Sequence, residues 1–287
     1  LRDMDAILGR DDRLVAKLTS AVEKLDVSFA AIIGTPVPAV IGTDYKALGR
    51  MTEKKTGLPV LTIDTNGMDL YDRGQEKAWL ALFKKFVVDE MSVEKGRVGI
   101  IGATPQDLSD LSAGDQLRQI FAADGKKAVC YGMGDGLDAV KQAASAEYNL
   151  VVSPSALETA KYLQKQFGTP YVVGYPLVKT MLPEADYTGK KVLIVHQQVM
   201  ANALREELKM RGASEVKACS WFDMKPELRE EDDVYLKEED DFTELAADSK
   251  WDVVIADDCM KSMLPKFDGQ FIGIRHFAVS GKLGGAC

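Results

Sequence analysis

Short, uninterrupted apolar runs alternate with helical patterns along most of this 287-residue chain. The run Val192-Leu193-Ile194-Val195 is the clearest, because none of its side chains is suited to face water. A strand of this kind is buried on both faces, which is typical of a parallel sheet covered by helices. Strands that alternate with helices of about 10–15 residues predict an α/β fold with mostly parallel sheets.

The pattern predicts three consecutive Rossmann-like units. Polar breaks at 92–96 and 183–189 separate them, so we expect domains at 1–94, 95–187 and 188–287. The last two units share an outline, since each opens with a basic residue before an apolar strand and has a helix closed by Gly. The predicted strands are 27–33, 58–65, 97–102, 128–131, 150–152, 171–173, 192–195, 216–220, 251–256 and 271–274. The predicted helices are 11–25, 44–55, 73–91, 112–124, 137–147, 155–167 and 201–210.

Composition excludes several classes of protein. The formal net charge of −8 and the pI near 5.0 argue against a nucleic-acid-binding surface. No apolar run approaches the ~20 residues of a membrane helix, and no signal peptide opens the chain. The cysteines Cys130, Cys219, Cys259 and Cys287 have no close spacing, which argues against a disulfide framework and a local zinc motif. We therefore expect a cytoplasmic protein with neither nucleic-acid nor membrane partners.

Two stretches contain residues that could bind a ligand, but their spacing favours plain loops. Residues 132–136 (Gly-Met-Gly-Asp-Gly) have a GxGxG spacing, whereas a dinucleotide fingerprint needs GxGxxG. We interpret them as a flexible loop between a strand and a helix. The acidic run 227–241 lacks the carboxylate spacing of a hard-cation site, so we predict a solvated loop there.

Single residues at strand ends are stronger candidates. His196 and His276 each follow an apolar strand, which places them near the carboxyl edge of a sheet, where α/β sites form. Cys259 follows another strand and is a candidate soft-metal ligand, whereas Cys130 lies inside a strand and is expected in the core. No Walker motif, nucleophile elbow or HExxH occurs in the sequence.

Residues 34–44 form the turn that carries the most meaning. This stretch, Gly-Thr-Pro-Val-Pro-Ala-Val-Ile-Gly-Thr-Asp, follows an apolar strand and precedes a helix. In α/β units, the turn at the carboxyl end of a strand is where ligands usually bind. The sequence therefore predicts a ligand-holding turn, which we call the opening turn.

The organisation of the chain resembles the nitrogenase component 1 family, whose subunits carry iron–sulfur and metal cofactors on three Rossmann-like domains. The opening turn is similar to the family's Cys-Pro-x-x-Leu-Ile-Gly-Asp-Asp segment. The sequence from Gly57 to Gly74 is similar to its next strand and Gly-containing loop, and 146–153 with 167–171 is similar to its A-x-x-N-L-V strand and F-G-x-P turn. The resemblance covers essentially the whole chain, and it implies a fragment truncated at both ends.

At the positions where the family binds cofactors, this chain differs. Thr35 stands where catalytic subunits have a cluster-ligating cysteine, and Ser153 where a cysteine holds the catalytic metallocluster. Gln75 replaces a histidine, while Gly67 lies in the matching loop and His276 falls near the second cofactor ligand. These five residues are the candidate cofactor-binding positions. Hydroxyls are poor ligands for iron–sulfur clusters, which need thiolates, so this chain itself holds either a cluster of altered ligation or none.

The resemblance implies an oxidoreductase subunit that accepts electrons from an ATP-dependent iron–sulfur partner and reduces an unidentified substrate. Its partners would be a second component 1-like subunit and an iron-protein-like reductase, in a homo- or hetero-oligomer. Two alternatives stay open: a non-catalytic cofactor-assembly scaffold, and a module that binds a small molecule or metallocofactor. The supply of thiolates separates them, because a cluster needs several and this chain offers four scattered cysteines.

Overall fold

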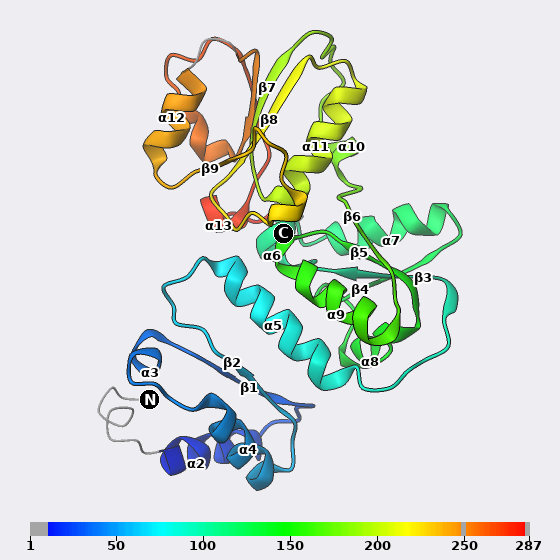
Figure 1. Cartoon of the computed structure of the whole chain (residues 1–287), viewed down its shortest axis with the longest axis vertical. Coiled ribbons are helices and arrows are strands. Elements are labelled where there is room, and N and C mark those ends of the chain that lie inside the picture. The colour runs from blue at the N-terminus through cyan, green and yellow to red at the C-terminus, as the bar shows by residue number, and fades with distance from the viewer. Residues whose placement is uncertain (1–10, 248–250, 285–287) are drawn as a thin grey trace. The chain divides into compact units, whose positions relative to one another are not determined.

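The computed structural model describes residues 11–247 and 251–284. The chain divides into two compact units, Leu1–Val88 and Asp89–Cys287, and each is described by itself (Figure 1). The fold is α/β, as the alternating pattern predicts, and every strand pairing within the described ranges is parallel.

In the first unit, helices pack on a parallel pair of strands. β1 (Ala30–Ile33) lies beside β2 (Val60–Ile63), with Ala30 opposite Val60. The connecting helix α4 (Tyr45–Thr56) begins where the Asp44 carboxylate accepts a hydrogen bond from Ala47 N at 2.9 Å, and it ends at Gly57, whose φ is 71°. The unit also contains α2 (Asp11–Val22), α3 (Pro36–Val40) and α5 (Tyr71–Phe86).

The second unit contains two parallel sheets. The first has the strand order β4-β3-β5-β6 and the second the order β11-β10-β7-β8-β9. The first is formed by β3 (Glu94–Ile101), β4 (Lys127–Cys130), β5 (Ala146–Val151) and β6 (Tyr171–Val173). The second is formed by β7 (Lys191–Val195), β8 (Glu215–Ser220), β9 (Val234–Tyr235), β10 (Val253–Ala256) and β11 (Gln270–Gly273).

Helices connect these strands in sequence order. Around the first sheet they are α6 (Pro105–Leu108), α7 (Ala113–Ala123), α8 (Leu137–Lys141), η1 (Ala143–Ser145), η2 (Pro154–Ala156), α9 (Leu157–Phe167) and α10 (Val178–Met181). Around the second they are α11 (Gln198–Met210), η3 (Pro226–Leu228), α12 (Glu239–Ala247), η4 (Asp258–Met263) and α13 (Phe277–Ser280).

The two sheets of the second unit share one hydrophobic core. A single cluster of buried side chains joins Val98 and Ile100 of β3 to Ile194 of β7 and Val253 of β10. A separate cluster, which includes Val254, fills the opposite face of the second sheet. Successive side chains of a strand point to opposite faces, so β7 and β10 are buried on both sides. This explains why their sequences are continuous apolar runs.

The predicted helix 137–147 is wrong beyond Lys141. α8 ends there, and β5 already begins at Ala146 because Ala146 pairs with Glu94 of β3. Pairing with β3 thus makes a strand of a segment whose Ala-rich sequence favours a helix. The same pairing starts β3 inside the polar break 92–96. The division into three domains stays a prediction beside the two compact units.

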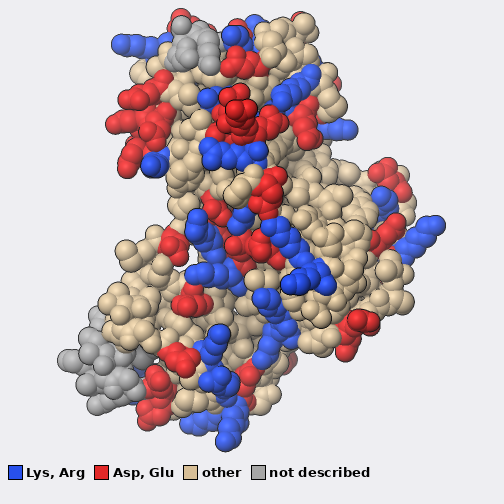
Figure 2. Space-filling model, viewed as in Figure 1, with Lys and Arg blue, Asp and Glu red and all other residues tan. Residues whose placement is uncertain are grey.

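The acidic run 227–241, predicted as a solvated loop, contains β9 and the start of α12. Asp233 is only 3% exposed and forms an ion pair with the buried Arg205 of α11. A buried guanidinium needs such a partner, because an unpaired buried charge is strongly destabilising. Glu239 and Asp240 do face solvent, and Figure 2 shows acidic side chains gathered over α12.

The 132–136 stretch lies between β4 and α8, as predicted, and Arg118 braces it by donating to Met133 O and by pairing with Asp135, at 2.7 and 2.8 Å.

Over 11–247 and 251–284, none of the helices combines the length and apolar composition needed to cross a membrane.

Candidate functional site

Each sheet of the second unit has a point where its connections change direction. After β3 the chain adds β4 on one side and then β5 on the other, and after β7 it adds β8 and β9 on one side and then β10 on the other. In open α/β sheets, ligands bind at the carboxyl ends of the strands at this point. Ser153 follows β5, while His196 and Asp257 follow β7 and β10.

The structure joins these two carboxyl edges directly. Gln197 Nε2 donates a hydrogen bond to Val152 O at 3.0 Å, and Phe277 N donates to Ser109 Oγ at 2.7 Å. His276 Nε2 lies 4.0 Å from Asp107 Oδ1. We call this meeting place the seam, and it comprises Asp107, Ser109, Val152, Ser153, His196, Gln197, Asp257 and His276. All eight residues are buried.

The two histidines lie together at the centre of the seam. Their ring centroids are 5.0 Å apart, and the His276 ring stacks on Phe222 at 4.4 Å. His196 Nε2 lies 3.2 Å from Arg275 O, which fixes Nε2 as the protonated nitrogen of a neutral ring. Burial lowers the pKa of His196 to about 4, and burial together with the neighbouring His196 lowers the pKa of His276 well below its usual value. Both rings are therefore neutral at pH 7.

Asp257 organises the loop that carries His276. Its carboxylate accepts hydrogen bonds from His276 N at 2.8 Å and from Cys259 N at 2.9 Å. Burial by itself would raise the pKa of Asp257, but these backbone donors outweigh burial and lower it. The residue is therefore ionised at pH 7 and holds its loop through charge-assisted hydrogen bonds.

Ser153 is a structural residue in this environment. It is fully buried, its Oγ lies 2.9 Å from Ser155 Oγ, and it caps η2 by accepting a hydrogen bond from Ser155 N. Gly102, at φ +91°, packs so closely that a Cβ there would lie 3.0 Å from the Ser153 Cβ. The hydroxyl is thus committed to a local cap, and backbone packs against the Cβ that carries it.

The other candidate positions belong to the first unit. The opening turn contains a short helix, α3. Thr35 precedes this helix, is exposed, and makes no side-chain capping bond to it. Pro36 takes the first helical position, where its missing N–H is of no consequence. A Cβ on Gly67, whose φ is +69°, would lie 2.8 Å from Pro36 Cδ, so the two loops are in contact. Gln75 lies half-buried in the second turn of α5.

The cysteines in the described ranges do not fit an iron–sulfur cluster. Burial raises the pKa of Cys130 and of Cys219 to about 12, and burial together with the Asp257 carboxylate raises that of Cys259 to about 11. Cluster ligands are thiolates, and a coordinating metal deprotonates a thiol, so the placement of the cysteines decides whether a cluster fits. Within the described ranges no three His, Cys, Asp or Glu side chains converge as a metal site would require. Cys259 as a soft-metal ligand therefore stays a prediction without support here.

Sequence reasoning found part of the seam. His196 and His276 follow strands, and the strand-end rule finds both, whereas Asp257 also follows a strand but is not among the predicted candidates. Asp107 and Ser109 lie on and after a short helix several residues beyond β3, so no strand-end signal marks them. Tyr175, whose buried hydroxyl lacks a hydrogen-bond partner among the described residues, was also missed. Burial raises its pKa, and the nearby Asp107 carboxylate adds to the rise.

Consecutive doubly wound sheets with facing switch points define the architectural class, and solved structures share it. One described as nitrogenase Cp1 at pH 6.5 matches with a TM-score of 0.70 at 12% identity, over 96% of this chain and 74% of that chain. Another, nitrogenase Cp1 at pH 5, matches with a TM-score of 0.71 at 15% identity, over 99% and 73%. At these identities the likeness establishes the fold alone.

The family follows from the sequence comparison. A profile described as nitrogenase component 1 type oxidoreductase matches residues 1–178, so the chain belongs to that family. The resemblance drawn from the motifs is confirmed. A curated relative, the nitrogenase iron-molybdenum cofactor biosynthesis protein NifE of Bradyrhizobium diazoefficiens, is 23% identical over 185 residues, which is 61% of this chain. The match spans only 32% of the length of that relative.

Proposed function

We propose that this chain is a component 1-like scaffold subunit, which supports the assembly or holding of a metallocofactor without supplying its thiolate ligands. The family membership gives the class of protein, and the relative named for cofactor biosynthesis gives the direction. The observation that carries the proposal is Ser153. The residue at the expected thiolate position is a buried helix cap bonded to Ser155, which is a structural role.

The opening turn supports docking of a second component 1-like subunit. Val37, Val40 and Ile41 recur at helical spacing on and just after α3, with 36%, 82% and 41% exposure. Met68, at 80% exposure, follows Gly67 in the loop that touches Pro36. Clustered exposed apolar side chains mark interaction surfaces. We call these four residues the apolar rim, and the proposed partner covers it in a homo- or hetero-oligomer.

A second candidate function keeps the electron-accepting role. In it, the subunit takes electrons from an ATP-dependent iron–sulfur reductase, and the partner subunit supplies the cluster ligands. Membership of an oxidoreductase family favours this candidate. It differs from the scaffold proposal in one measurable respect, since it requires turnover driven by the reductase.

The test is anaerobic purification of the chain, alone and with the products of neighbouring genes. Iron and acid-labile sulfide are measured per chain, in the wild type and in Thr35→Ala and Ser153→Ala. The scaffold proposal expects an iron-free chain alone, and iron in the partner complex that neither substitution lowers. Stoichiometric iron in the chain alone, lowered by either substitution, overturns it. If the complex contains iron and turns over with a reductase and ATP, the electron-accepting function is correct and the scaffold proposal is wrong. An iron-free complex overturns both proposals.

A further inference from the structure

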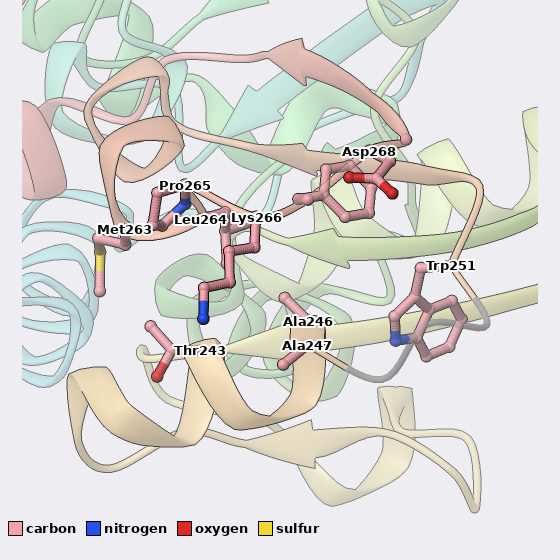
Figure 3. Close-up of a pocket in the computed structure, with 11 residues that line it drawn as sticks. Thr243, Ala246, Ala247, Trp251, Met263, Leu264, Pro265, Lys266 and Asp268 are labelled. Atoms are coloured by element: carbon pink, nitrogen blue, oxygen red, sulfur yellow. The ribbon is translucent and has the colours of Figure 1, made fainter.

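A pocket of about 380 Å³ lies at the edge of the second sheet opposite the seam. It is bounded by the C-terminal half of α12, by Trp251 just before β10, and by the segment that leads from η4 to β11 (Figure 3). The seam lies at the carboxyl ends of β10 and β11, whereas this pocket lies at their amino ends. The pocket is therefore separate from the candidate site and from the family's expected cofactor positions.

Two aromatic rings form fixed walls of this pocket. Trp251 is 4% exposed, and its Nε1 donates a hydrogen bond to Leu245 O at 2.9 Å. The Phe267 ring lies over Gly269, where a Cβ would come within 2.4 Å of Phe267 Cζ, so only glycine allows that ring position. Leu264 and Ala247 add aliphatic surface. Rigid aromatic walls around a volume of this size are typical of small-molecule sites.

Among the described residues that line the pocket, Lys266 carries the positive charge, and it is exposed to solvent. In Figure 3 the Lys266 side chain extends into the pocket, with its ammonium between Leu264 and Thr243, while the Asp268 carboxylate lies at the far end. Among the described residues, no carboxylate pairs with Lys266. The Thr243 hydroxyl donates to Asp240 O at 2.9 Å, so its oxygen still accepts hydrogen bonds. A neutral ligand would cover the ammonium without compensating it, and a cation would be repelled.

We propose that this pocket binds a small organic anion that has a flat apolar body and one carboxylate or sulfonate group. The body contacts the apolar lining, which includes Trp251 and Phe267, and the anionic group pairs with Lys266. The inference is independent of the scaffold proposal, because no residue of the pocket belongs to the seam or to the apolar rim.

The test uses 8-anilinonaphthalene-1-sulfonate, an aromatic sulfonate that becomes fluorescent in apolar sites. We expect saturable binding of one probe per chain and competition by 2-naphthoate. Lys266→Gln should weaken binding about fivefold, since it removes one ion pair. The matched control is Lys261→Gln, an exposed lysine of η4 outside the pocket, which should leave binding unchanged. Ala247→Trp should fill the pocket and abolish binding, with the melting temperature measured in parallel.

Each result decides the proposal. Unchanged probe binding in a folded Ala247→Trp variant places the probe elsewhere and overturns the site. Equal affinities of the wild type and Lys266→Gln for the probe overturn the anion assignment. Because Lys266 is exposed, this substitution should leave the fold intact. The test therefore stays valid even if Ala247→Trp fails to fold. Neutral N-phenyl-1-naphthylamine should bind both proteins equally. Probe binding that falls as the chain self-associates would assign the pocket to a second copy instead.

Discussion

The opening turn and the seam place two hydroxyl side chains in opposite physical settings. Thr35 and Ser153 are the positions where the resemblance to the family predicts cysteines in catalytic subunits. Thr35 is exposed beside the apolar rim and makes no capping bond, whereas Ser153 is fully buried and bonded to Ser155. On the surface, Thr35 leaves the neighbouring apolar side chains exposed. In the interior, the replacement has become part of the packing.

The comparison predicts its largest effect at Asp257. Asp257→Ala should destabilise the second unit by about 3 kcal/mol, because the buried N–H of His276 and the part-buried N–H of Cys259 lose their acceptor. The neighbouring Asp258 pairs with Arg275 at an exposed site, so Asp258→Ala should change stability by less than about 1 kcal/mol. Hydrogen exchange of the β7 and β10 amides in denaturant reports this unit separately. Equal effects of the two substitutions would mean that the seam is no more cohesive than the surface.

The second prediction is that the stability of the two units depends differently on pH. An unfolded histidine binds a proton below about pH 6.5, whereas folded His196 stays neutral down to about pH 4. Its stabilising contribution is thus complete above pH 6.5 and is lost as the pH falls toward 4. The slope is about 1.4 kcal/mol per pH unit for each such histidine.

Both histidines of the chain, His196 and His276, lie in the second unit. Between pH 6.5 and 5, amide exchange should therefore show a loss of stability in β7 and little change in β1 and β2. His196→Gln removes one titrating group and keeps a hydrogen-bond donor near Arg275 O, so it should make the dependence shallower. An unchanged slope in this variant would contradict the buried neutral state of His196.

A third prediction compares thiols placed at the two positions. A cysteine introduced by Thr35→Cys should react readily with a thiol reagent in the native protein, whereas one introduced by Ser153→Cys should react more slowly, on the order of 100-fold. The second substitution should also cost roughly 1 kcal/mol, since it weakens the cap and enlarges the side chain against Gly102. Peptide mapping by mass spectrometry reads each cysteine separately. Comparable rates would show that position 153 is open to solvent.

The sequence predicts strands where burial on both faces removes polar residues. The run 192–195 covers all of β7 but its first residue, and the run 251–256 contains β10, because a parallel sheet leaves these strands no solvent face. It fails at Ala146, where Ala-rich periodicity favours a helix and only the pairing with β3 makes a strand. It fails again at Asp233, whose burial depends on Arg205, a residue far away in the chain.

The same limit applies to the candidate site. Strand ends locate His196 and His276 by a local rule, since every strand of a parallel sheet delivers its carboxyl end to the same edge. Asp107 and Ser109, which contact His276 and Phe277, lie in and just after the short helix α6 beyond β3. The packing of the first sheet against the second brings them to the seam. No local pattern records that packing. The pocket beside Trp251 is invisible in the sequence for the same reason.

The smallest effect on stability is expected at the apolar rim, and it tests what that surface is for. Val40→Ser and Met68→Ser should change the free energy of unfolding by less than about 0.5 kcal/mol, because both side chains are mostly exposed. If a partner subunit covers the rim, both substitutions should weaken its binding about tenfold or more, since buried apolar contacts at interface centres carry much of the affinity.

Leu25→Ser supplies the matched control, because Leu25 is also apolar, 62% exposed and in the first unit, but outside the apolar rim. Affinity for the co-purified partner, measured by sedimentation or calorimetry, should be unchanged in this variant. If all three substitutions weaken binding equally, the loss reflects general surface hydrophobicity and the rim has no special role. If none does, the partner docks elsewhere, and the opening turn would need another explanation for its exposed apolar side chains.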